Sequence, residues 1–123
     1  MTAIGRLKNR YEFLYVKAGT RFATPSLVLQ ARRRAAPEPA HLARFGFTAT
    51  KSLGGAVVRN RARRRLKEAV RLTGPTHAAD GYDYVLIARG GTVQRPFTEL
   101  VKDLERALAK VHEPSSKKTR RKS

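Results

Sequence analysis

The sequence has no cysteine and no tryptophan, and acidic residues are scarce in it. Its 123 residues include 9 Asp+Glu against 27 Lys+Arg, which gives a formal net charge of +18. Without cysteine, disulfide frameworks, thiolate zinc sites and cysteine nucleophiles are excluded. So one-sided a charge in a short chain predicts a polyanionic partner rather than an ordinary neutral enzyme. Because 18 of the cations are Arg, whose planar fork binds phosphates, nucleic acid is the favoured partner.

Long apolar runs are also missing. The longest lies at residues 84–88 and has the length of a strand, which excludes a transmembrane helix and a membrane partner. The first 20 residues are basic, but they include Glu12 and have an amphipathic pattern, so an ordinary helix is favoured over a transit peptide. We therefore expect a cytoplasmic protein with one domain over residues 1–113. Residues 114–123 hold five basic residues and no acid, which predicts a disordered basic tail.

Apolar periodicity predicts the order helix, strand, strand, helix, strand, helix, and therefore helices packed on a small sheet. The predicted strands cover residues 26–32, 44–50 and 83–89; the predicted helices cover residues 7–18, from 56 to about 72, and from 96 to about 111. Gly74-Pro75 is expected to end the middle helix. The core-facing stripe of the first helix is predicted at Leu7, Tyr11, Leu14, Tyr15 and Ala18, with Phe13 and Val16 off it.

The middle helix carries the most unusual pattern, AVVRNRARRRLKEAVRL. Its apolar stripe is predicted at Val58, Ala62, Leu66, Ala69 and Val70, and the helix holds seven basic residues with one acid, Glu68. Because the cations repel one another without acids to balance them, a polyanion is expected to cover this helix.

Two residues near this pattern allow two interpretations each. Asn60 lies within the arginine cluster, where its amide can donate to a phosphate or a base edge, or simply pair locally. Phe13 lies off the main stripe of its helix, near Lys17. It is either a core residue or part of a groove for an unpaired nucleotide strand.

No protein-borne active site is apparent. The three histidines are isolated in the sequence, and Asp80-Gly81 indicates a turn before it indicates an acid pair with Asp83. Residues 51–55, KSLGG, have the wrong order for a phosphate-binding loop.

Residues 51–68, KSLGGAVVRNRARRRLKE, resemble the Arg-Asn-Arg signature of the bacterial ribonuclease P protein subunit. The resemblance extends to RYEF at residues 10–13, to RFGFT before the signature and to DYVLIA after it. It implies an α+β fold: a two-layer α/β sandwich whose small mixed sheet has a left-handed βαβ crossover through the basic helix. General topology rules would instead predict a right-handed crossover.

The resemblance also implies an activity, the endonucleolytic removal of the 5′ leader from precursor tRNA. In this family the RNA subunit and its Mg²⁺ carry the chemistry. The protein binds no cofactor alone and supplies no catalytic residue or metal ligand. The implied partners are ribonuclease P RNA and precursor tRNA, with one protein per RNA.

Matching positions assign the expected contacts. The residues expected to face the RNA subunit are Lys51, Arg59, Asn60, Arg61, Arg63, Arg64 and Lys67. Those expected to line the leader cleft are Phe13, Lys17, Val28 and Gln30, although Lys17 and Gln30 stand where the family often has aromatics.

Three alternatives stay open at this point. A ribosomal or general structured-RNA-binding protein needs the same charge and core. A DNA-binding protein could place the basic helix in a major groove, although its arginines lack the mixed polar side chains that read bases. A self-sufficient protein nuclease is disfavoured by the scarcity of acids and the isolated histidines.

Overall fold

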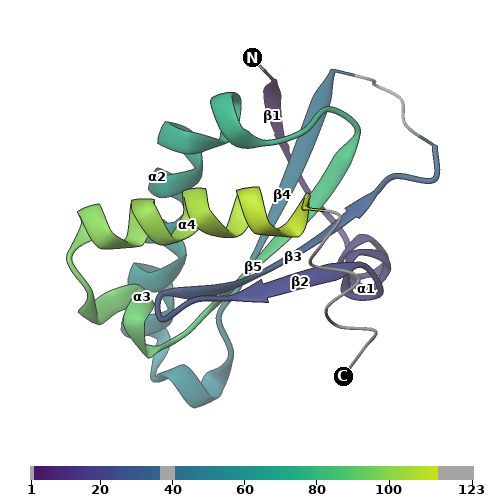
Figure 1. Ribbon diagram of the computed structural model, residues 1–123. Helices are drawn as coiled ribbons and strands as arrows, with labels where there is room; N and C mark the ends of the chain where they lie inside the picture. Colours follow the sequence, from purple (N-terminus) through teal and green to yellow (C-terminus); the bar gives the residue numbers. More distant parts are fainter. Residues whose placement is uncertain (1, 37–40, 114–123) are drawn as a thin grey trace, which may run out of the picture.

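The protein is a five-stranded mixed sheet with helices on both faces (Figure 1). The computed structural model describes residues 2–36 and 41–113; the predicted tail at residues 114–123 lies outside them. The elements in chain order are β1 (Ala3–Arg6), α1 (Arg10–Lys17), β2 (Thr20–Ala23), β3 (Leu27–Arg33), β4 (Leu42–Thr48), the 3-10 turn η1 (Lys51–Leu53), α2 (Ala56–His77), β5 (Tyr82–Ala88), α3 (Gly90–Gln94) and α4 (Phe97–Val111).

The strands lie in the order β1-β4-β5-β3-β2. β5 pairs parallel with β4 and antiparallel with β3, so the sheet is mixed as expected. Helix α2 connects β4 to its parallel neighbour β5, which confirms the βαβ unit; its left-handed sense stays a prediction from the resemblance. The short elements β1, β2 and α3 were not predicted from the sequence, because they are only four or five residues long.

The larger core lies between the sheet and the helices α2 and α4, on what we term the α2–α4 face. Alternate strand residues supply it, among them Phe45 and Phe47 of β4 and Tyr84 and Leu86 of β5. On α2 the predicted stripe is buried from Ala62 to Val70, whereas Val58 in the first turn is 37% exposed. On α4 the apolar residues Leu100, Leu104, Leu108 and Val111 pack inward. Asp103 is buried beside them because it accepts a hydrogen bond from Ser26 and pairs with Arg95.

The opposite face of the sheet, the α1 face, has a smaller core. It is formed by Leu7, Val16 and Val85, with Phe13, Tyr15 and Ile87 against it. The predicted stripe of the first helix was therefore right at Leu7 and Tyr15 and wrong at Tyr11, Leu14 and Ala18. Tyr11 is 78% exposed and Leu14 is 50% exposed, and the residues set aside from that stripe, Phe13 and Val16, turn inward.

The first helix also begins later than predicted, because Asn9 caps it. The Asn9 side chain accepts from the backbone N–H of Glu12, and the Glu12 carboxylate accepts from the backbone N–H of Asn9. This reciprocal capping box fixes the start at Arg10. Leu7 thus belongs to the approach from β1, where its N–H donates to the carbonyl of Phe45.

Helix α2 runs past the expected stop at Gly74-Pro75. Pro75 lies in the last turn, and the helix ends at His77, where the N–H of Ala78 donates to the carbonyl of Gly74. Gly74 brings β1 close to this turn, since a Cβ there would lie 3.0 Å from Cδ1 of Ile4. The Pro75 carbonyl accepts from the N–H of Thr2, which ties the start of β1 to the end of α2.

Candidate RNA-binding surfaces

Helix α2 holds most of the residues expected to face RNA. Its inward stripe fixes the rotation of the helix and keeps the cations between the stripe residues out of the core, although Arg63 and Lys67 line a cavity beside β4. Arg61, Arg64 and Lys67 are exposed, while Arg59 and Arg63 are half-buried. None of these five side chains pairs with a carboxylate among residues 2–36 and 41–113.

Two other cations of α2 have internal partners. Arg65 donates from Nε to the carbonyl of Thr92 at 2.7 Å and from a terminal nitrogen to the carbonyl of Arg95, so it holds the segment that contains α3. Arg71 pairs with Glu68 at 2.6 Å. The sequence could not separate Arg65 from its neighbours, because only the tertiary fold brings the α3 carbonyls to it.

Asn60 is exposed and contacts Arg63. The Arg63 guanidinium donates to the amide oxygen of Asn60 at 2.9 Å, one helical turn along. The local-pairing interpretation of Asn60 therefore describes the contact seen in this structure. The contact uses only the amide oxygen, so the NH₂ group stays available as a donor.

Lys51 lies in η1, just before the start of α2, and it is exposed. The first turn of α2 contains no acidic residue, and Gly55 at its N-cap provides no side-chain hydrogen bond. The helix dipole and the first-turn N–H groups of such an end favour anions. Lys51 and the first turn of α2 thus extend the positive surface of the helix.

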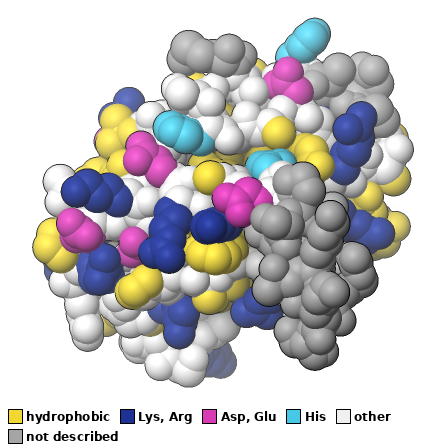
Figure 2. Space-filling model, in the orientation of Figure 1, with side chains coloured by type: hydrophobic (Ala, Val, Ile, Leu, Met, Phe, Trp, Pro, Cys, Tyr) yellow, Lys and Arg dark blue, Asp and Glu magenta, His cyan; other side chains and the backbone are white. Residues whose placement is uncertain are grey.

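The surface over α4, next to α2 on the same face of the sheet, has a different electrostatic character. Basic and acidic side chains are intermixed over the face that α4 covers (Figure 2). Helix α4 contributes the pair Lys102–Glu99, and Arg95 pairs with Glu99 and Asp103. Balanced charge of this kind does not favour a polyanion, so α2 is the stronger candidate surface.

The residues expected to line a leader cleft come from α1 and β3. Val28 pairs with Ile87 and Gln30 with Val85, and this register puts both on the α1 face of the sheet, where Phe13 also packs. Val28 is only 7% exposed and Gln30 only 6%, so each offers little surface to a ligand. Lys17, at the last position of α1, is exposed.

Besides the exposed Lys17, Phe13 is the accessible member of that set. It lines a cavity of about 210 Å³ together with Gly46 of β4 and two cations of α2, Arg63 and Lys67; the remaining lining residues are Arg6, Leu7, Phe45 and Phe47. An aromatic ring beside cations is a typical binding surface for an unpaired nucleic-acid strand. Arg6 belongs to this group and was missed, because β1 was not recognised.

An ion-pair network holds α1 against the sheet. Arg44 of β4 pairs with Glu12 of α1 at 3.0 Å and with Asp83 of β5 at 2.6 Å, and Arg34 also pairs with Asp83 at 2.9 Å. The backbone N–H of Lys8 donates to the Glu12 carboxylate at 2.6 Å, and this bond, together with that from Asn9 and with Arg44, lowers the pKa of Glu12. The hydrogen bond to Asp83 raises the pKa of Arg44.

The histidines and acids considered for chemistry have structural contacts. His112 lies 2.6 Å from the Tyr84 hydroxyl, whose pKa is raised by burial. Asp80 accepts a hydrogen bond from the Thr2 hydroxyl at 2.7 Å, and Asp83 forms ion pairs with Arg34 and Arg44. Within the described part of the chain, no group of three or more His, Cys, Asp and Glu is arranged to hold a metal ion. In the same residues no helix is long and apolar enough to span a membrane.

Comparison with known proteins gives one consistent result. The family model described as Ribonuclease P matches residues 1–112. A ribonuclease P protein component from Gluconacetobacter diazotrophicus is 53% identical over 106 residues, which are 85% of this chain and 89% of that protein. Another from Ruegeria pomeroyi is 47% identical over 114 residues, 92% of this chain and 90% of that protein.

Solved structures agree with the sequence relatives. The RNase P protein of Staphylococcus aureus superposes with a TM-score of 0.70 at 26% identity, over 88% of this chain and 97% of that chain. The RNase P protein of Thermotoga maritima gives a TM-score of 0.66 at 25% identity, over 80% of this chain and 90% of that chain. The expected mixed α/β fold is thereby confirmed.

Proposed function

The chain belongs to the family of ribonuclease P protein components, and from this membership we propose how its two surfaces serve the enzyme. Its function is that of the protein subunit of ribonuclease P, the tRNA-processing ribonucleoprotein. The relatives named above all have this description, which favours it over a ribosomal or general RNA-binding role.

We propose that α2 and Lys51 bind the folded RNA subunit. The observation that carries this proposal is the set of five α2 cations without a carboxylate partner: Arg59, Arg61, Arg63, Arg64 and Lys67. Asn60 supports the surface by orienting Arg63 and offering its NH₂ group. Phosphates that approach this helix relieve the repulsion among its cations.

The α1 face is proposed to contact the 5′ leader of precursor tRNA. Phe13 supplies an aromatic surface for an unpaired base, and Lys17 supplies a charge at the end of the same helix. Val28 and Gln30 form the floor beneath, and their low exposure makes them supports of that surface more than contacts.

Hydrolysis of the bond that joins the leader to the tRNA is assigned to the RNA subunit and the Mg²⁺ bound to it. One protein binds per RNA. The complex acts in the cytoplasm, where tRNA precursors are made. The protein's acids support this division of labour, since Glu12 and Asp83 are engaged by arginines. Its contribution is to neutralise phosphates and to bind the leader.

The proposal is tested by reconstitution with a bacterial ribonuclease P RNA at low Mg²⁺. The chain is expected to stimulate correct 5′ cleavage, and Arg63→Ala with Arg64→Ala is expected to weaken RNA binding. Because each phosphate contact contributes about 0.7–0.9 to the slope of log affinity against log salt, the double variant should flatten that slope.

A matched control removes two charges elsewhere. Lys102→Ala with Arg106→Ala alters the exposed side of α4 and should leave the salt slope unchanged. Equal slopes for the two double variants would show that α2 is not the RNA-binding face. Absence of stimulation by the unaltered chain would contradict the assigned function itself.

A further inference from the structure

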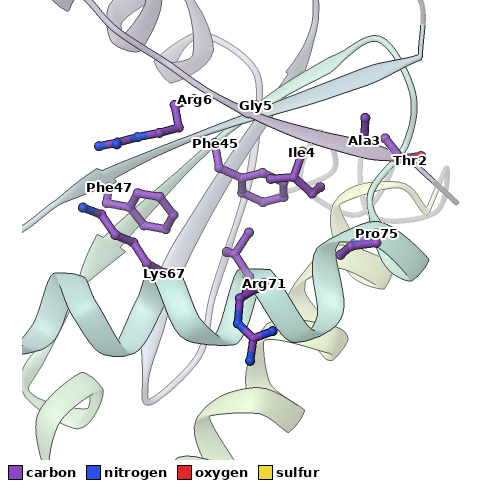
Figure 3. A pocket seen from close by; sticks show the side chains of 11 residues that line it. Thr2, Ala3, Ile4, Gly5, Arg6, Phe45, Phe47, Lys67, Arg71 and Pro75 are labelled. Carbon is purple, nitrogen blue, oxygen red and sulfur yellow. The ribbon is translucent and has the colours of Figure 1, made fainter.

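A pocket of about 470 Å³ lies between β1, β4 and α2 (Figure 3). Its wall is mostly apolar: Ile4 from β1, Phe45 and Phe47 from β4, and Val70 and Pro75 from α2. The volume lies within the range of about 300–1,000 Å³ that small-molecule sites span. Of the residues predicted to bind the RNA subunit or the leader, only Lys67 lines this pocket, so those predictions do not account for it.

One end of the pocket is positively charged. Arg6 and Lys67 border it beside Phe47, and the Lys67 ammonium lies 6.0 Å from the centre of the Phe47 ring. Within the described residues neither cation pairs with a carboxylate. Arg71 contributes its stem to the wall, but its guanidinium is directed away from the pocket and held by Glu68.

The other end of the pocket is lined by uncharged residues. Thr2 and Pro75 close it, and Thr2 donates to the carboxylate of Asp80. A ligand that matches this pocket has a flat apolar part for the interior and a negative group for the cationic end at Arg6 and Lys67. A nucleotide unstacked from its neighbours has both, with a base on one side and phosphates on the other.

We infer that this pocket takes up one unstacked nucleotide of the ribonuclease P RNA, its base between Ile4 and Phe47 and its phosphate at Arg6 and Lys67. The inference rests on the proposed function, because it specifies where the RNA subunit inserts a base beside α2. Arg6 becomes an RNA contact and Phe47 a base-contacting residue.

The position of the pocket beside α2 favours the RNA subunit over the leader as the source of the nucleotide. The pocket lies on the α2–α4 face, and Lys67 of its rim stands on the helix proposed to dock on the RNA subunit. The leader is proposed to contact the α1 face, whose Phe13 cavity borders this pocket at the residues that both share, Arg6, Phe45, Phe47 and Lys67.

Photocrosslinking in the assembled complex tests the source of the nucleotide. The chain has no cysteine, so Ala3→Cys creates a single attachment point at the exposed edge of the pocket for a benzophenone maleimide. Ala109→Cys, on an exposed position of α4, is the matched control. Crosslinks from residue 3 are expected at one or two adjacent unpaired nucleotides of the RNA subunit.

The outcomes separate the pocket from the function. Crosslinks to the leader, crosslinks as dispersed as those from residue 109, or none in a complex that still cleaves correctly each overturn the pocket and leave the proposed function intact. If the unlabelled chain neither binds nor stimulates the RNA, the proposed function fails and the pocket inference fails with it.

Methyl NMR of the full chain tests the base directly. The sequence contains two isoleucines: Ile4 lines the pocket, and Ile87 lies on the α1 face as an internal control. Titration with AMP or UMP to millimolar concentration should shift the Ile4 δ1 signal and leave that of Ile87 in place. An Ile4 signal that does not move, or that inorganic phosphate moves equally, overturns a base-binding pocket.

Discussion

The ring of Phe13 lies directly against Gly46. A Cβ placed on Gly46 would approach Cζ of the ring to 2.5 Å, closer than any real side chain allows, so the glycine is what admits the aromatic ring to the edge of β4. The same Cβ would lie 3.0 Å from Cδ1 of Leu7, so Leu7 bounds this contact on the side of the segment between β1 and α1. The position of the proposed leader-binding ring is thus decided by a residue on a strand 33 positions away in the sequence.

Phe13→Ala is expected to lower the affinity for precursor tRNA while leaving the affinity for mature tRNA unchanged. The loss should be about 1–3 kcal/mol, the usual value for one base stacked on an aromatic side chain. Binding of the two RNAs to the reconstituted enzyme measures it. Equal losses for precursor and mature tRNA would remove Phe13 from the leader contact.

Gly46→Ala is expected to displace the Phe13 ring and so to reproduce the Phe13→Ala defect. In a double-mutant cycle the two changes should not add, because both act through the same ring. Gly90→Ala is the control, since a Cβ there meets no atom within 4 Å. Additive losses would mean that Gly46 affects precursor binding by another route.

Arg64→Ala and Arg65→Ala should separate binding from stability in neighbouring residues. Arg65 donates to two main-chain carbonyls, so its loss should lower the free energy of unfolding by about 1–3 kcal/mol and leave the salt slope of RNA binding unchanged. Arg64 is exposed, so its removal should flatten the slope without affecting stability. Thermal denaturation and salt titrations of both variants check this; a reversed pattern would contradict the assigned roles.

The Glu12–Arg44 pair should make stability depend on acid pH. The folded state lowers the pKa of Glu12 from its ordinary value of 4.5, so its contribution is fully present above that value and is lost as pH falls through the lower folded pKa. Denaturant unfolding between about pH 6 and 3 should therefore show a smaller pH dependence for Glu12→Gln.

Glu105→Gln serves as the control for that measurement, because it removes a carboxylate on α4 without affecting Arg44. If Glu12→Gln and Glu105→Gln have the same pH profile, the network does not secure α1. Arg44→Ala is expected to be more severe, since Asp83 is 2% exposed and would lose one of its two arginines.

The sequence predicted the elements whose patterns are long. The stripe of α2, the stripe of α4 and the apolar run of β5 each persist long enough to fix element type and face. It did not predict β1 or β2, because a four-residue strand acquires its pattern only from its neighbour: Ile4 is recognisable as core only beside Ala43. The face of α1 was assigned correctly only at Tyr15, because eight residues allow two stripes, and Leu7, although buried, was counted within the helix despite the cap at Asn9.

The candidate surfaces show the same limit. The sequence alone identified α2 as a candidate, because the excess of basic over acidic residues in this helix can be counted directly. Which arginines are free for RNA depends on contacts between distant segments, such as Arg65 with the α3 carbonyls and Arg34 with Asp83. The apolar pocket was not foreseen, because it requires β1 beside α2.

The strand order has a consequence for how the chain folds during synthesis. Two pairs, β1–β4 and β2–β3, can form without the rest, but both need β5 between them to become one sheet. β5 follows α2 in the chain, so the cationic helix leaves the ribosome before the strand that completes its support. Until β5 is in place, Leu66 and Val70 lack part of the core that they pack against. A helix built to bind RNA is therefore first exposed, incompletely packed, beside ribosomal RNA, another polyanion that can hold it.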